Sequence, residues 1–237
     1  MTLLLAHRGS HRDHIENTMP AFEAALAEGA DGVELDVRVC RSGEVVVVHD
    51  PTLERVAGRP LEIARVPWSL LRNVEVGPGR LSCLDDVLDR VIGAGKLVNV
   101  EVKGDVPDPR RTARLVGALL MRRTASERES VLLSAFHPNV LGALATSAPN
   151  VRRGFLFDLE HTGRWRAEMI RRLLRPHGLH PHFSLCTPSA VSRWRGEGRY
   201  VAPWTLNDPE EAVTVCQRGV DFIITDDVPR LREVLPL

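Results

Sequence analysis

Four short polar motifs in this chain of 237 residues each close a run of apolar residues. They are His7-Arg8, Glu34-Leu35-Asp36, His49-Asp50 and Glu101-Val102-Lys103. Ionised groups are costly at the ends of buried strands unless they meet one another. Two histidines, an arginine, a lysine and the three carboxylates of Glu34, Asp36 and Glu101 therefore indicate one site, in which a divalent cation lies beside an anionic substrate.

Period-two alternation along a strand brings the carboxylates together. Glu34 and Asp36 point the same way, and Glu101 shares a face with Lys103 on a later strand. Three crowded carboxylates repel one another unless a cation lies among them, and all-oxygen ligands suit Mg²⁺ or Ca²⁺ better than zinc. Glu34, Asp36 and Glu101 are therefore candidate ligands of one divalent cation, Mg²⁺ or Ca²⁺.

The basic residues of the motifs suit an anionic substrate. Arg8 and Lys103 face a group that needs further positive charge. A phosphate fits, because arginine can bind it through two hydrogen bonds and lysine acts as a point charge. His7 and His49 can share the proton transfers near neutral pH, one as base and the other as acid.

Each of these residues also has a structural explanation when it is taken alone. His7 could be a core histidine with satisfied hydrogen bonds. Asp36 or Glu101 could belong to a salt bridge at the rim of a barrel, and His49-Asp50-Pro51 could be a turn. The joint pattern of four motifs in order at strand ends favours a functional site.

Strand-like and helix-like segments alternate along the chain. Short apolar runs predict strands at residues 3–7, 33–39, 45–49, 97–103, 131–136, 153–157, 182–186, 200–205 and 222–225. Apolar residues at helical spacing predict helices at residues 17–28, 84–92, 109–123, 138–145, 165–174, 188–195, 209–218 and 228–234.

The second and third strands are joined by residues 40–44 alone. Parallel strands need a longer crossover, so this pair forms an antiparallel hairpin that turns near Ser42-Gly43. A symmetric turn there would bring His49 roughly opposite Asp36. Eight strands remain, each followed by a helix. The alternation predicts an α/β fold, a (β/α)8 TIM barrel with a β-hairpin extension after strand 2, whose site lies at the carboxyl ends of the strands.

Residues 51–82 interrupt the alternation, because glycines and prolines break any long helix there. We expect a single TIM-barrel domain over residues 1–237, with 51–82 as a short insertion over the active face. The insertion could act as a substrate lid, or it could be an irregular surface loop.

Composition narrows the class of protein. Basic and acidic residues number 31 each, which favours neither nucleic acid nor a membrane surface as a partner, and 43% apolar residues support a large core. The four cysteines lie far apart and suit reduced thiols better than disulfides. No apolar run approaches the length of a membrane span. We expect a cytoplasmic protein without stable membrane insertion. The sequence does not predict its oligomeric state.

In this order the motifs resemble the glycerophosphodiester phosphodiesterase family, among the phospholipase C-like phosphodiesterase barrels. The resemblance covers nearly the whole chain. It rests on His7-Arg8-Gly9 with Glu16-Asn17-Thr18, Glu34-Leu35-Asp36-Val37, Val48-His49-Asp50-Pro51-Thr52-Leu53 and Glu101-Val102-Lys103. Weaker matches are Ser134-Ala135-Phe136, Trp204-Thr205-Leu206-Asn207 and Thr225-Asp226-Asp227-Val228-Pro229. One departure is the charged stretch His11-Arg12-Asp13-His14 beside the predicted site.

The resemblance implies metal-assisted hydrolysis of a small-molecule glycerophosphodiester. The neighbouring glycerol hydroxyl attacks phosphorus and expels the alcohol, and water then opens the cyclic phosphate to give glycerol phosphate. One histidine deprotonates the hydroxyl and the other protonates the leaving oxygen. The implied residues are Glu34, Asp36 and Glu101 for the cation, His7 and His49 for proton transfer, and Arg8 and Lys103 for the phosphate.

Three further positions have open roles. Glu16 could lie behind the metal ligands, or Asn17 or Thr18 could cap the first helix while Glu16 favours its positive end, which we prefer. Trp204 could pack against the glycerol or fill the mouth of the barrel. Asp226-Asp227 is interpreted as a helix N-cap without a chemical role.

Two other functions remain open. The same site could act as a lysophospholipase D-like or cyclising phosphodiesterase on a larger substrate, since a short insertion leaves an open rim. The barrel could also bind metal and phosphate without catalysis, although a binding module has no need of both histidines.

Overall fold

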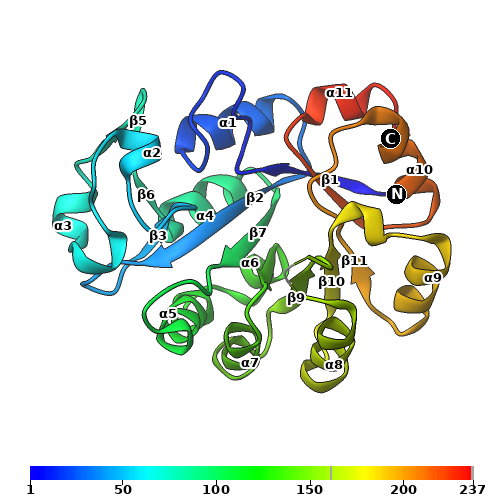
Figure 1. Cartoon of the computed structure of the whole chain (residues 1–237). Helices are drawn as coiled ribbons and strands as arrows, with labels where there is room; N and C mark the ends of the chain where they lie inside the picture. The colour runs from blue at the N-terminus through cyan, green and yellow to red at the C-terminus, as the bar shows by residue number, and fades with distance from the viewer. Residues whose placement is uncertain (161, 236–237) are drawn as a thin grey trace.

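The computed structural model describes residues 1–160 and 162–235 and shows a closed ring of parallel strands surrounded by helices (Figure 1). The ring runs in the order β11-β10-β9-β8-β7-β2-β1-β12, with every neighbouring pair parallel. Its strands are β1 (Leu3–His7), β2 (Gly32–Val39), β7 (Leu97–Val102), β8 (Val131–Ala135), β9 (Arg152–Phe157), β10 (Gly178–Pro181), β11 (Tyr200–Val201) and β12 (Phe222–Thr225).

Backbone hydrogen bonds close the ring between β11 and β12. Asp221 N donates to Val201 O at 2.9 Å, and Ile224 N donates to Pro203 O at 3.0 Å. The predicted TIM barrel is therefore confirmed.

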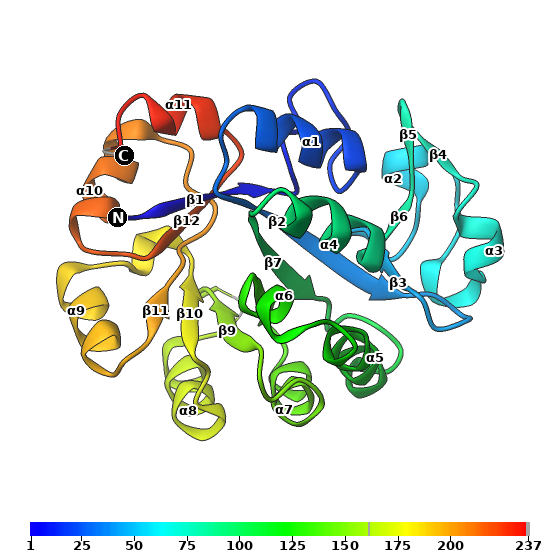
Figure 2. The same cartoon turned by 180° about the vertical axis from the view of Figure 1, so that it is seen from behind.

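The helices lie outside the ring, as the two opposite views show (Figures 1 and 2). They are α1 (Met19–Ala27), α4 (Leu84–Gly93), α5 (Pro109–Met121), α6 (Ala125–Glu129), α7 (Pro138–Ser147), α8 (Arg164–Leu174), α9 (Pro188–Gly196), α10 (Pro209–Gln217) and α11 (Val228–Arg232). A side chain caps the start of seven of them, at Thr18, Asp108, Thr124, His137, Thr187, Asp208 and Asp227. The sequence predicted these helices closely, except that it missed the short α6.

Two of the predicted strands need correction. The strand predicted at residues 182–186 is wrong, because Phe183–Leu185 is a 3₁₀ helix (η2) and the barrel strand β10 lies just before it. β10 reads Gly-Leu-His-Pro, which has little strand propensity. Gly178 is required there, since a Cβ would lie 2.1 Å from the Tyr200 ring. The strand predicted at 200–205 is reduced to β11, and proline at 203 has no N–H for a ladder.

The predicted hairpin is confirmed, with its register moved by one residue. β3 (Val45–Val47) pairs antiparallel with β2, and Val37 lies opposite Val47. Cys40 N donates to Glu44 O, so the loop between them has three residues and is centred on Ser42 rather than between Ser42 and Gly43. Val48, not His49, is therefore the residue hydrogen-bonded to Asp36 across the hairpin.

The insertion is a packed unit rather than an irregular loop. It holds α2 (Glu54–Ala57), η1 (Ile63–Arg65), α3 (Trp68–Leu71), β4 (Glu75–Val76), β5 (Gly79–Arg80) and β6 (Ser82–Cys83), and β6 pairs with β3. Leu53, Ile63 and Leu71 form an apolar cluster with Val46 and Val48 of the hairpin. Its role as a lid stays a prediction.

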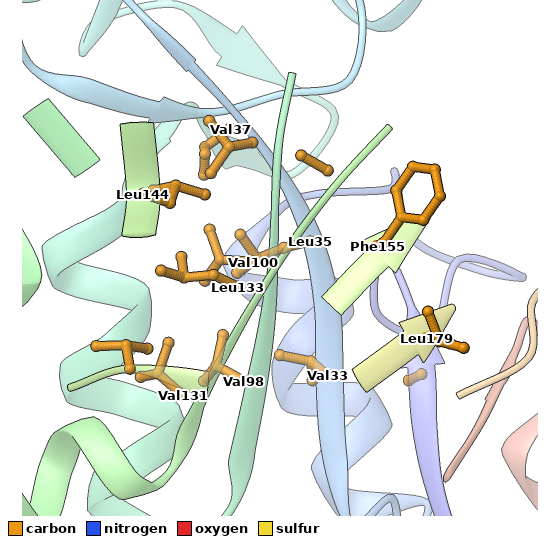
Figure 3. Close-up of a cluster of buried hydrophobic side chains, with 14 of the residues drawn as sticks. Val33, Leu35, Val37, Val98, Val100, Val131, Leu133, Leu144, Phe155 and Leu179 are labelled. Atoms are coloured by element: carbon orange, nitrogen blue, oxygen red, sulfur yellow. The ribbon is translucent and has the colours of Figure 1, made fainter. Parts of the chain in front are cut away.

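The main core lies between the ring and the helices. Val33, Leu35 and Val37 of β2 pack there with Val98 and other labelled residues (Figure 3). Since side chains alternate along a strand, Glu34 and Asp36 of β2 face the interior of the barrel. A smaller apolar cluster inside the barrel, formed by Leu5, Leu132, Ala202, Phe222 and Ile224, fills the space below the polar motifs.

Candidate active site

The three predicted metal ligands meet inside the barrel. Glu34 and Asp36 lie on β2 and Glu101 on β7, and the parallel register pairs Asp36 with Glu101. One oxygen of each carboxylate lies within 4.8 Å of the others. The register also pairs His7, at the end of β1, with Glu34. The sequence motifs therefore converge as expected.

The charges around Asp36 keep it ionised. Lys103 Nζ donates to Asp36 Oδ1 at 2.9 Å and to Glu101 Oε1 at 2.8 Å, and Asn17 Nδ2 donates to Asp36 Oδ2 at 2.9 Å. Burial alone would raise the pKa of Asp36, but Lys103 and Arg8 outweigh it and hold the pKa well below its usual range.

Glu34 is the carboxylate whose burial is least compensated, although Arg8 and Lys103 act to lower its pKa. Burial, followed by the charges of Asp36 and Glu101, raises its pKa well above the usual range. Its hydrogen bond from the backbone N–H of Arg8, at 3.2 Å, is too weak to offset them. Burial also raises the pKa of Glu101, against the opposing effect of Lys103. Such a crowded, all-oxygen set fits a hard divalent cation, which would relieve the repulsion.

Each predicted catalytic histidine is held by an aspartate. His7 Nδ1 lies 2.7 Å from Asp226 Oδ1, and His49 Nδ1 lies 2.7 Å from Asp50 Oδ1. This arrangement leaves Nε2 of each ring as the atom that can exchange a proton. His7 Nε2 lies 4.0 Å from Glu34 Oε2, so it borders the carboxylates.

Asp226 was missed as a site residue. The N-cap interpretation holds for Asp227, whose side chain accepts from Arg230 N, but it is wrong for Asp226. Asn207 Nδ2 donates to Asp226 Oδ2 at 2.6 Å and so fixes the carboxylate that holds His7. Asn207 follows β11 and Asp226 follows β12, and this position after the last two barrel strands was the signal that could have pointed to the two residues.

Glu16 positions Arg8. Its carboxylate accepts from Arg8 Nη1 at 2.9 Å and pairs with Arg55 of α2, while Arg8 Nε lies 3.2 Å from Asp36 Oδ2. Thr18 caps α1, and it was one of the two residues predicted as the cap of this helix. Arg8 has φ +57°, and the next residue must be glycine, since a Cβ at Gly9 would lie 2.7 Å from the α1 backbone.

Arg38 is a second residue that the sequence did not single out. It is buried on β2, donates from Nε to the backbone oxygen of His49 at 2.8 Å, and binds both carboxylate oxygens of Asp105. It therefore ties the hairpin that carries His49 to the chain that follows Lys103.

Two adjoining cavities open at this end of the barrel. The smaller, of about 270 Å³, is lined by both histidines, Arg8, Glu34, Glu101 and Lys103. The larger, of about 650 Å³, shares His49, Glu101, Lys103, Phe136 and Trp204 with it and extends to Ile170 of α8. Trp204 is fixed by a hydrogen bond from Nε1 to His180 O at 2.8 Å and packs edge-on against Phe136.

Residues 7–230 match the model of the glycerophosphoryl diester phosphodiesterase family. The chain belongs to this family. The matched range begins at His7 and ends in α11, so it includes every candidate residue of the site.

Relatives in the phosphodiesterase family match this chain over nearly their whole length. A glycerophosphodiester phosphodiesterase of Caldanaerobacter subterraneus is 29% identical over 95% of this chain and 94% of its own. The crystal structure of a glycerophosphodiester phosphodiesterase from Thermotoga maritima is 30% identical, with a TM-score of 0.82 over 99% of both chains. An Oleispira antarctica phosphodiesterase, solved with the product sn-glycerol-3-phosphate, has the same fold at 23% identity, with a TM-score of 0.86 over 99% of this chain and 96% of its own.

Proposed function

We propose that this chain is a metal-dependent glycerophosphodiester phosphodiesterase that releases glycerol phosphate and an alcohol. The observation that carries the proposal is the cluster of three carboxylates, two of which (Glu34 and Glu101) line one cavity of a family barrel together with two aspartate-held histidines. The product named for the Oleispira relative, sn-glycerol-3-phosphate, is the product that this reaction gives.

We assign one divalent cation, Mg²⁺ or Ca²⁺, to Glu34, Asp36 and Glu101. When bound, it neutralises charge on the phosphate and orients the attacking hydroxyl. The support for this assignment is that one oxygen of each carboxylate lies within 4.8 Å of the others, and that burial together with the charges of Asp36 and Glu101 raises the pKa of Glu34.

Arg8 and Lys103 would supply the remaining positive charge for the phosphate. The glycerol hydroxyl next to the phosphodiester attacks phosphorus and passes its proton to Nε2 of one histidine, His7 or His49. The other histidine gives a proton from Nε2 to the leaving alcohol oxygen. Water then opens the cyclic phosphate with the two roles exchanged. Asp226 and Asp50 hold the rings in the orientation that these transfers need.

Trp204 and Glu16 would have different roles. We propose that Trp204 contacts the substrate at the mouth of the barrel, because it lines both cavities. Glu16 would act through Arg8, which it holds, rather than by direct contact.

We further propose that residues 1–237 work as one domain with 51–82 as its insertion. A cytoplasmic location is proposed on the basis of four free cysteines.

The larger cavity also favours a second candidate substrate. Phe136, Trp204 and Ile170 offer apolar surface to a bigger alcohol group, as in a lysophospholipid. Among the described residues no helix is both long and apolar enough to cross a bilayer.

The two candidates are separated by turnover. Rates with glycerophosphocholine and lysophosphatidylcholine are measured with Mg²⁺, with Ca²⁺ and with a chelator. Turnover of glycerophosphocholine alone, lost with chelator, supports the first proposal. Faster turnover of the lysolipid supports the second, and turnover that survives the chelator contradicts both.

A further inference from the structure

A second cluster of potential metal ligands lies beside the carboxylates. Asp226 Oδ1 is shared by two imidazoles, with His7 Nδ1 at 2.7 Å and His11 Nε2 at 3.0 Å. One possible ligand atom from each of the three residues lies within 4.8 Å of the other two. All three side chains are partly exposed, so an ion can reach them from solvent. His11 belongs to the charged stretch in which this sequence departs from the family pattern.

The donor set of this cluster differs from that of the carboxylate site. Two imidazole nitrogens and one carboxylate oxygen suit Zn²⁺ and similar transition-metal ions, whereas Mg²⁺ and Ca²⁺ prefer oxygen alone. Zinc binds nitrogen and oxygen at about 2.0–2.2 Å, which places tetrahedral ligands roughly 3.3 Å apart. The observed separations of 2.7 and 3.0 Å need to open by only a few tenths of an ångström.

The surroundings hold Asp226 in the orientation that such a site needs. Asn207 Nδ2 donates to Oδ2, and Asn207 Oδ1 accepts from Thr225 Oγ1 and from the backbone N–H of Asp226. Oδ1 is thereby directed at the two imidazoles. Supporting hydrogen bonds of this kind commonly orient metal-binding carboxylates. The nearby Arg12 is paired with Asp227, which reduces its repulsion of a cation.

We propose that His7, His11 and Asp226 form a second, inhibitory metal site that takes Zn²⁺ or a transition-metal ion of the same class. A metal ion bound at this site is coordinated by the lone pair of His7 Nδ1, so the single ring proton of neutral His7 is then on Nε2. Nε2 can no longer accept a proton, so His7 leaves the acid–base cycle. The inhibitory effect rests on the proposed catalytic role of His7, whereas zinc binding itself does not.

Calorimetry tests the binding. Zn²⁺ is titrated into the protein with saturating Mg²⁺, which occupies the carboxylate site. The wild-type protein should bind one zinc ion per chain, and His11→Gln should weaken that binding by at least about tenfold, the least expected from disturbing a metal site. His14→Gln, in the same loop but outside the cluster, is the matched control and should bind zinc as the wild type does. Equal zinc affinity in wild type and His11→Gln would overturn the proposal.

Kinetics tests the inhibition. For each variant the rate with zinc is divided by its own rate without zinc, so that a change in basal rate does not enter. The ratio should fall well below one for wild type and His14→Gln and stay near one for His11→Gln. Inhibition that survives in His11→Gln, or that excess Mg²⁺ relieves, would assign zinc to the carboxylates and contradict the proposal. Zinc binding that depends on His11, in a protein without phosphodiester turnover, would support the zinc site and contradict the proposed function.

Discussion

At the scale of single residues, Glu34 is the group that most needs a cation. It is buried beside two other carboxylates, and its pKa is raised by burial and by their charges. Without a cation it takes up a proton more readily than an ordinary glutamate, which lowers the repulsion but removes the ligand. This makes Glu34 the best single position at which to separate metal binding from folding.

We predict that Glu34→Gln lowers turnover by more than about 100-fold, because a lost ligand should cost at least as much as a lost supporting contact. The free energy of unfolding without cation should change by less than about 1 kcal/mol, since the change removes charge repulsion rather than packing. Turnover and urea unfolding check the two parts. Glu44→Gln, at the exposed hairpin turn, is the control, and full activity in Glu34→Gln would contradict the metal site.

Asp226 and Asp227 form a matched pair with different expected effects. Asp226→Asn should lower kcat by up to about 10²-fold, within the range of acid–base catalysis, because it removes the carboxylate that orients His7. Asp227→Asn should leave kcat unchanged, since asparagine also caps helices. Steady-state kinetics of both variants decides, and equal kcat values would remove Asp226 from the site.

Residue types and spacing alone predicted which side chains come together at the candidate site. Period two along β2 places Glu34 and Asp36 together, and this needs no tertiary information. Asn17, Asp226 and Asn207 escaped detection because their partners lie 19 or more residues away in sequence. No local pattern distinguishes such a residue from a turn or a cap.

At the scale of elements, the hairpin β2–β3 positions His49 near the carboxylates. Arg38 holds it in place through the backbone oxygen of His49 and through Asp105. We predict that Arg38→Gln lowers kcat by up to about 10²-fold, since a displacement near 1 Å can cost that much.

Metal affinity should change little in Arg38→Gln, because the hydrogen bonds of the Arg38 side chain go to His49 and Asp105 and not to the proposed metal ligands. Isothermal titration with Mg²⁺ and steady-state kinetics separate the two effects. Arg65→Gln, whose side chain is 80% exposed and paired with Glu62, is the control. A loss of metal binding equal to the loss of kcat would show that Arg38 supports the cation site instead.

Elements with strong local signals were predicted well. Proline in the first turn and a capping side chain before it mark α5, α9 and α10. β10 was misplaced because its sequence is set by tertiary contacts: Gly178 accommodates the Tyr200 ring, and His180 is fully buried. The hairpin register was one residue off because turn composition does not reveal loop length.

At the scale of the whole molecule, the barrel brings together groups from both ends of the chain. His7 and Asp226 are separated by 219 residues, so the site forms only when β12 closes against β1. Binding of the proposed cation should therefore be linked to folding, because the unfolded chain does not hold the three carboxylates together.

We predict that Mg²⁺ or Ca²⁺ at a hundredfold excess over its Kd stabilises the fold by about 2.7 kcal/mol. For a chain of this size that raises Tm by roughly 5–10 °C. Thermal unfolding with cation and with chelator measures the shift. The same shift in Glu34→Gln would place the cation elsewhere.

The most direct test of the account is ³¹P NMR of the purified protein with glycerophosphocholine, with Mg²⁺ or Ca²⁺ and again with a chelator. We predict that glycerol phosphate appears only with the cation, which would establish both the reaction and the P–O bond that breaks. Release of phosphocholine, or conversion that continues in the chelator, would contradict the account.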